Sequence, residues 1–187
     1  GNAWNSYATD GSRVYEAKGV LNMEIAEGPL DDGGIQFTTL STKENILKGD
    51  FDVQVNFQLN PEFHAKGHTN VWLWVLRARD EPHKEDWIRI GIADKGYRSW
   101  EGHHGPPGNY WTEYGSSPTD DLEGKLRIKR VGNLITTYYW DHGWVQHAQW
   151  ESVLISPSDD LAIYLNAFNY EPEFSPFWVK WDNLISY

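Results

Sequence analysis

The residues best suited to chemistry lie in one stretch of the chain, Trp100–Trp111, which is rich in rings and hydrogen-bonding groups. Flat indole and phenol rings bury the C–H faces of sugar rings well. The carboxylate, imidazoles and amide among them can hydrogen-bond hydroxyl groups. We therefore interpret the stretch as a binding loop, with a surface loop held together by its own aromatic side chains as the alternative. The side chains concerned are Trp100, Glu101, His103, His104, Asn109, Tyr110 and Trp111.

The same region holds the candidates for an enzymatic site. Glu101 and Glu113 could act as general acid and as base or nucleophile if their carboxyl groups lay roughly 5–9 Å apart in one cleft. In a lyase, Tyr110 or His103 could remove the proton instead. The alternative is that both Glu side chains are solvated at strand ends. We favour this alternative because the chain has no recognisable catalytic strand, and we expect no catalytic residues.

Strands must position these groups, since apolar and polar residues alternate along much of the chain. In Phe51–Leu59 every second residue is apolar, and the residues between them are Asp52, Gln54, Asn56 and Gln58. A period of two indicates a strand with one buried and one wet face. Amides on the wet face favour a neutral, hydroxyl-rich ligand.

About a dozen such segments, separated by Gly, Pro, Asn and Asp, predict an all-β sandwich of two antiparallel sheets with jelly-roll topology. Gly132-Asn133 and His142-Gly143 are expected hairpin turns. The predicted strands are Val20–Ile25, Ile35–Leu40, Phe51–Leu59, Val71–Arg79, Trp87–Ala93, Tyr97–Glu101, Tyr110–Tyr114, Lys125–Val131, Leu134–Asp141, Trp144–Glu151, Leu161–Phe168 and Phe177–Tyr187.

The strand faces predict which side chains are buried. The expected core is Phe51, Val53, Val55, Phe57, Ile88, Ile90, Ile92, Leu126, Ile128, Leu161, Ile163, Leu165, Val179 and Trp181. In Val71–Arg79 the face with the two arginines is expected to be the wet one, which makes Trp72 and Trp74 core residues.

The polar faces predict one binding patch, provided that the strands concerned are neighbours. Trp87 is the first choice as a stacking platform because the opposite face of its strand is all Ile. Arg89 would project beside it and donate hydrogen bonds to sugar oxygens. The patch consists of Gln54, Asn56, Arg77, Trp87, Arg89, Tyr164 and Asn166, rimmed by Trp100, Glu101, His103, Tyr110 and Trp111.

The composition and net charge limit the classes of molecule that the protein can bind. The 187 residues carry a formal net charge of −11, with a pI near 5.0, which argues against nucleic acid and anionic membrane. No run approaches the ~20 apolar residues of a membrane span. There are 11 Trp, 10 Tyr and no Cys, so disulfides and thiolate metal sites are excluded. We expect one domain.

Four segments resemble motifs of concanavalin A-like lectin/glucanase domains, in the same order. Asp86–Ile92 resembles their Trp-hydrophobic-Lys/Arg-x-Gly strand, and Gly49–Val53 their Gly-Asp-Phe strand. Leu126–Trp144 resembles their Leu-Arg…Tyr-Tyr…Asp-Gly-x-Trp meander. Phe177–Leu184 resembles their closing strand.

This resemblance covers roughly the span from Gly49 to the end, and it implies a jelly roll that binds or acts on glycans. The chain departs from the glycosidase branch, since it lacks a Glu-x-Asp-x-x-Glu strand, and from the alginate-lyase branch, since it lacks a Gln-x-His strand. Related jelly rolls can hold a structural calcium near the closing strand. The resemblance implies Asp182 as a ligand here, with Gly49, Asp50 or Glu24, and the alternative is an Asp182 bonded to backbone N–H groups.

We expect non-catalytic binding of a polysaccharide or oligosaccharide, with no required cofactor, by a monomer that is secreted or at the cell surface. The start of the chain reads as a trimmed N-terminus, so an export signal would not be visible. Two alternatives remain open. One is a small glycoside hydrolase or polysaccharide lyase on the same fold, and the other is a protein-interaction or adhesion domain.

Overall fold

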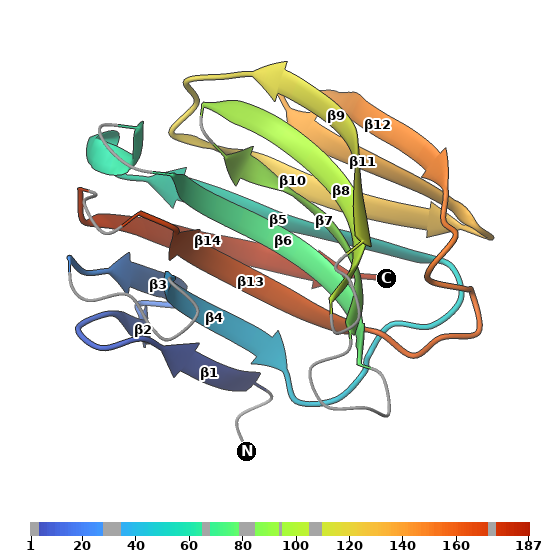
Figure 1. Cartoon of the computed structure of the whole chain (residues 1–187), viewed down its shortest axis with the longest axis horizontal. Helices are drawn as coiled ribbons and strands as arrows, with labels where there is room; N and C mark the ends of the chain where they lie inside the picture. The colour runs from blue at the N-terminus through green and yellow to red at the C-terminus, as the bar shows by residue number, and fades with distance from the viewer. Residues whose placement is uncertain are drawn as a thin grey trace.

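A computed structural model describes residues 4–27, 35–64, 68–78, 85–93, 95–104, 110–171 and 175–187. Within these residues, fourteen strands form two seven-stranded sheets that lie face to face (Figure 1). The only helical element among them is a 3-10 turn, η1 (Pro61–His64). No helix in the described part of the chain is long and apolar enough to cross a membrane.

The first sheet, here called sheet A, has the order β1-β4-β13-β6-β7-β8-β9, and every pair in it is antiparallel. Its strands are β1 (Trp4–Ala8), β4 (Gln36–Thr42), β6 (Thr69–Ala78), β7 (Glu85–Ala93), β8 (Gly96–His104), β9 (Tyr110–Pro118) and β13 (Ala162–Asn169).

The second sheet, sheet B, has the order β12-β11-β10-β5-β14-β3-β2 and is also antiparallel throughout. Its strands are β2 (Arg13–Ala17), β3 (Val20–Ile25), β5 (Phe51–Leu59), β10 (Glu123–Val131), β11 (Leu134–Trp140), β12 (Trp144–Glu151) and β14 (Phe177–Ser186). Non-consecutive neighbours in both sheets give the crossing connections of a jelly roll, so the predicted fold class is confirmed.

The inner faces of the two sheets share one hydrophobic core. All fourteen residues predicted to be buried lie in it, and each is at most 3 % exposed. The period-two pattern is therefore a reliable guide to the inner face of β5, β7, β10, β13 and β14. The turns predicted at Gly132 and His142 join β10, β11 and β12, and both residues have positive φ.

Strands β1 and β2 were not predicted. They stand at one edge of sheet A and sheet B respectively, and most of their side chains are exposed or half-buried. An edge strand with little buried surface has no strong hydrophobic alternation, which removes the signal that identified the other strands.

Candidate functional site

A groove runs across the outer face of sheet A, on the side turned away from the core. Its volume is about 640 Å³. Cross-strand pairing places Tyr164, Trp74, Arg89, Trp100 and Glu113 in one row across β13, β6, β7, β8 and β9. The groove is lined by Ile35, Phe37, His68, Asn70, Trp72, Trp74, Glu85, Trp87, Arg89, Ala93, Arg98, Trp100, His103, Trp111, Asn166, Phe168 and Tyr170.

Arg89 stands at the centre of the groove, surrounded by indole rings. Its guanidinium carbon lies 4.3 Å from the ring centre of Trp72, 4.5 Å from Trp87, 5.0 Å from Trp100 and 5.2 Å from Trp74. All four distances are within the roughly 6 Å range of cation–π attraction. The rings therefore hold the cation in place. Trp72 and Trp87 are almost fully buried, whereas Trp74 and Trp100 are partly exposed to the groove.

Two glycines leave the space that lets these indoles lie close to the sheet. A Cβ on Gly91 would lie 2.7 Å from the Trp72 ring, and one on Gly102 would lie 2.3 Å from the Trp87 ring. Both distances are shorter than real Cβ contacts, so only glycine fits at either position without movement. Gly91 follows Arg89 by two residues and thus shares its face.

No described acid forms a direct ion pair with Arg89, although Glu113 attracts its charge at longer range. Arg89 makes no ion pair with the described residues, and its partner is the hydroxyl of Tyr170. Glu113, the acid in its row, lies 3.6 Å from Arg98. Desolvation lowers the pKa of Arg89 to about 10, which still leaves it charged at neutral pH.

Several predicted binding residues do meet in this groove. Trp87, Arg89, Trp100, Trp111 and Asn166 line it together, and Tyr164 is on the same face beside Trp74.

His103 also lines the groove, at one end. Its Nδ1 lies 3.0 Å from an oxygen of Asp86, which also binds Arg77. Asn109 lies outside the described residues, as does the side chain of His104.

The prediction that Gln54 and Asn56 belong to the same patch is wrong. They are on β5, in the middle of sheet B, and face outward on the opposite side of the sandwich. Their surroundings there are charged and aromatic. In this surface Arg127 hydrogen-bonds Asp52 and lies 5.3 Å from the Trp144 ring centre. The alternation predicts that the amides lie on the solvent-facing side of their strand, but it does not predict to which sheet that strand belongs.

Arg77, Glu101 and Tyr110 are not part of the groove, which corrects three further predictions. Arg77 is on the inner side of β6 and bonds Asp86 and Asp159. Glu101 is paired with Ile88 and shares its inward direction. Tyr110 precedes Trp111 on β9 and therefore points to the other side of the sheet.

The prediction that Trp72 and Trp74 are core residues is also wrong. They face the groove, and Val71, Leu73 and Val75 pack in the core instead. The presence of Arg77 and Arg79 suggested the reverse, but Arg77 can sit on the inner side because it is at the strand end, where Asp86 and Asp159 neutralise it. Arg79 lies outside the described residues.

A sequence signal for these residues did exist. The aliphatic residues Val71, Leu73 and Val75 match the three Ile of β7, and the same side of both strands should have been chosen as core. The lining residues outside the predicted patch and rim are Ile35, Phe37, His68, Asn70, Trp72, Trp74, Glu85, Ala93, Arg98, Phe168 and Tyr170.

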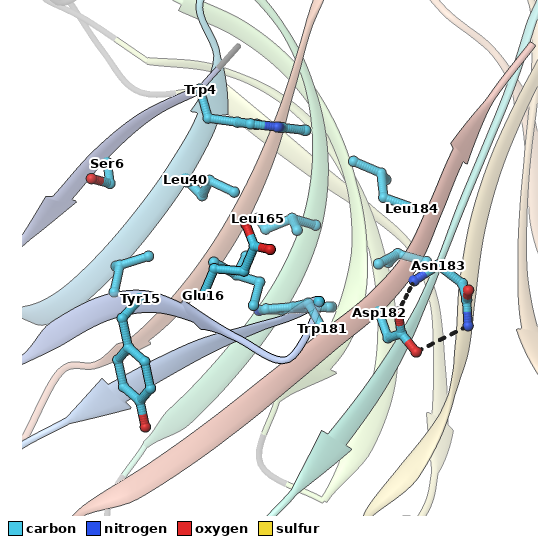
Figure 2. A pocket seen from close by; sticks show the side chains of 14 residues that line it. Trp4, Ser6, Tyr15, Glu16, Leu40, Leu165, Trp181, Asp182, Asn183 and Leu184 are labelled. Atoms are coloured by element: carbon cyan, nitrogen blue, oxygen red, sulfur yellow. Dashed lines mark hydrogen bonds between the residues drawn. The ribbon is translucent and has the colours of Figure 1, made fainter. Parts of the chain in front are cut away.

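A second hollow opens between the two sheets beside β1 and β2, with a volume of about 610 Å³ (Figure 2). Trp4, Leu40 and Trp181 point into it. Its walls are side chains of the inner faces, and Asp182 and Asn183 lie at its side. A ligand there would have to enter between the sheets.

The ligands proposed for calcium are not brought together. Asp182 accepts hydrogen bonds from the backbone and side chain of Asn183, which matches the alternative interpretation of this residue. Glu24 binds Arg13 and Tyr15, Asp50 accepts the Gly132 N–H, and the Gly49 carbonyl accepts a bond from Arg130. No three His, Cys, Asp or Glu side chains in the described ranges form a group that could hold a metal ion.

No protein-family model matches the chain, and no curated protein matches it by sequence. Solved structures do match its fold. A family 16 glycoside hydrolase endo-glucanase from Bacteroides ovatus superposes with a TM-score of 0.65 at 11 % identity, covering 98 % of this chain and 94 % of that one.

Two structures named for carbohydrate recognition or binding match over similar lengths. The carbohydrate recognition domain of Emp46p gives a TM-score of 0.63 at 14 % identity, over 98 % of this chain and 89 % of that chain. The carbohydrate-binding module CBM66 from Bacillus subtilis gives a TM-score of 0.57 at 10 % identity, covering 98 % of this chain and 94 % of that one. These structures therefore share the two-sheet jelly-roll fold of this chain, which is the fold that the sequence motifs predict.

Proposed function

We propose that this concanavalin A-like sandwich binds a polysaccharide or oligosaccharide, without cleaving it, in the groove of sheet A. The observation that carries the proposal is the set of indoles around Arg89 in one groove, of which Trp74 and Trp100 are partly exposed. Aromatic faces bury sugar C–H surfaces, and an arginine donates to the ring and hydroxyl oxygens. Lectin and carbohydrate-module structures with this fold support the assignment.

The carboxylates of sheet A favour binding over hydrolysis. On its outer face Glu85 and Glu113 are four residues and two strands apart in register. Their backbones are then separated by about 16 Å, from about 3.3 Å per residue and 4.8 Å per strand. Glycosidases hold their two carboxyl groups within roughly 5–9.5 Å. Glu101, the other predicted acid, faces inward.

A secreted or cell-surface location belongs to the same proposal, because carbohydrate recognition by modules of this fold acts on glycans outside the cytosol. We also propose that the protein is a monomer.

Affinity electrophoresis on a panel of soluble polysaccharides tests the function. We expect retardation by at least one glycan, with no new reducing ends and no unsaturated products after prolonged incubation. Product formation would make the protein a hydrolase or lyase. The absence of retardation by any glycan would favour the protein-interaction alternative.

A further inference from the structure

The groove holds a cation that no described carboxylate contacts. Arg89 is half-buried, its guanidinium is enclosed by four indoles, and no carboxylate among the described residues pairs with it. Arg77 is paired with Asp86 and Asp159, and Arg127 with Asp52. Arg130, which is also buried, donates instead to the backbone carbonyls of Gly49 and Ser156. A charge removed from water without a partner costs free energy, so its retention needs a reason.

The hydrogen-bonding groups of the groove show the same imbalance. Six enclosed side-chain nitrogens along it have no hydrogen-bond partner in the described part of the chain, and all six are donors. They are the indole nitrogens of Trp72, Trp74 and Trp100, the Nε atoms of Arg89 and Arg98, and Nδ2 of Asn166. All six atoms are shielded from solvent, so a ligand that brings oxygen acceptors would satisfy them only after the side chains around them shift.

We propose that the ligand of this groove is an acidic glycan, one of whose anionic groups, a uronate carboxylate or a sulfate ester, binds the guanidinium of Arg89. This proposal rests on the proposed function and specifies its substrate class. A carboxylate or sulfate supplies both the negative charge and several acceptor oxygens. The exposed parts of Trp74, Trp100 and Trp111 would bury the faces of the charged sugar and its neighbours.

Tyr170 would complete the recognition. Its ring packs edge-on against Phe168 at 5.1 Å, and its hydroxyl shares a hydrogen bond with Arg89. The side chain is 47 % exposed, so it stands at the wall of the groove where a ligand enters. A hydroxyl beside the guanidinium adds a further donor to an anion bound there.

The net charge of −11 makes this interaction selective rather than general. Long-range repulsion of a polyanion is screened beyond about 8 Å at physiological salt. A bound anion is then held by contact with Arg89 and the neighbouring donors. A polyanion outside the groove makes no such contacts, so nothing offsets its repulsion by the net negative charge of the protein.

The test compares polymers that differ in charge alone, at 0.15 M salt, by titration of the tryptophan fluorescence. A soluble polyuronate is compared with its fully methyl-esterified form, and dextran sulfate with dextran. We expect at least tenfold tighter binding of the polyuronate than of its ester, or of the sulfate than of dextran. The first result identifies a carboxylate, the second a sulfate.

Equal binding of the charged and neutral forms would overturn the acidic ligand and leave glycan binding intact. No binding to either acidic polymer would overturn it too. Retardation by the neutral polysaccharides among those used in the electrophoresis experiment then tests the proposed function separately.

The variant Arg89→Gln should lose the preference for the charged polymer, with a ratio near one. Arg89→Lys should keep part of it, because the charge remains. Arg127→Gln is the matched control, since Arg127 also lies against aromatic rings but on the other sheet. If Arg89→Gln unfolds, the comparison of charged and neutral polymers on the unaltered protein still decides the proposal. An unchanged ratio in a folded Arg89→Gln would contradict it.

Discussion

Glu101 and Glu113 project from neighbouring strands to opposite faces of sheet A. The register pairs Glu101 with Thr112 and Glu113 with Trp100, which fixes their opposite directions. The pair therefore cannot face one cleft. Glu101 is only 1 % exposed and accepts hydrogen bonds from the Ser152 hydroxyl and the Val153 N–H. Its carboxylate connects β8 to the segment that follows β12.

We therefore expect Glu101→Gln to lower the free energy of unfolding. The new amide would turn an NH₂ group toward a donor, and a buried group left unsatisfied costs about 1–3 kcal/mol. Denaturant unfolding measures the loss. Glu113→Gln is the control, because the 3.6 Å contact of Glu113 with Arg98 is half-exposed and such pairs contribute about 0–1 kcal/mol. A stable Glu101→Gln protein that had lost a glycan-cleaving activity would contradict this interpretation.

Trp111 should contribute to glycan binding with little effect on folding. It lies at the edge of the groove, in the row of Trp87 and Gly102, and is 52 % exposed. Removing an exposed platform loses ligand contact but little core packing. We expect Trp111→Ala to weaken binding about tenfold, or ~1.4 kcal/mol, in titrations with the best glycan found.

The neighbouring residue provides a matched control. Tyr110 is on the same strand, is also 52 % exposed and points to the other side. Tyr110→Ala should leave the affinity unchanged and the melting temperature similar to that of Trp111→Ala. Equal losses of affinity in the two variants would place the glycan at the loop end instead of the groove.

The sequence predicted the fold better than it predicted the site, for a physical reason. Strand alternation reports which residues share a face, and Phe51–Leu59 and Trp144–Glu151 match the observed strands end to end. It does not report which strands are neighbours. Gln54 and Arg89 have the same pattern around them, yet they belong to different sheets, and only tertiary pairing separates them.

The error at Trp72 has a different origin. Large aromatic residues are usual in cores, and this one is only 2 % exposed, so burial itself was predicted correctly. What covers it is Arg89 on the outer face instead of the second sheet. Trp87 shows the same property: its outward direction is as predicted, but it is only 6 % exposed. We therefore expect Trp87→Ala to lower stability as well as affinity.

Gly102 should be needed for the position of Trp87. A Cβ there would lie 2.3 Å from the indole, and overpacking of this kind costs about 1–3 kcal/mol. We expect Gly102→Ala to reduce the free energy of unfolding and, by displacing Trp87 toward Arg89, to weaken glycan binding.

The control for this substitution is on the same strand. At Gly96 the nearest atom to an added Cβ is the Ser117 carbonyl oxygen, at 3.4 Å. Gly96→Ala should be tolerated, and can gain stability because alanine restricts the unfolded chain. If both variants unfolded at the same denaturant concentration as the unaltered protein, the indole would have room to move and the glycine would not be required.

His147 should make stability depend on pH. Its Nε2 donates to the Tyr97 carbonyl at 3.1 Å, so Nδ1, 2.8 Å from the Ser99 hydroxyl, is the acceptor in the neutral ring. Desolvation lowers its pKa below the ordinary 6.5, opposed by the bond to Tyr97. The folded state then binds fewer protons than the unfolded state, so stability is full above about pH 6.5 and falls as the pH drops through it. The loss levels off below the folded-state pKa.

Urea unfolding at pH 7.5, 6.5 and 5.5 measures this dependence, in a window above that of ordinary carboxylates. We expect a lower midpoint at pH 5.5, and a flatter profile in His147→Gln. His142→Asn is the control, because His142 is fully exposed in a turn at φ 52°, a conformation that Asn tolerates. That variant should keep the slope of the unaltered protein. A profile that His147→Gln left unchanged would show that another group causes the dependence, and that the pKa of His147 is the same in the folded and the unfolded state.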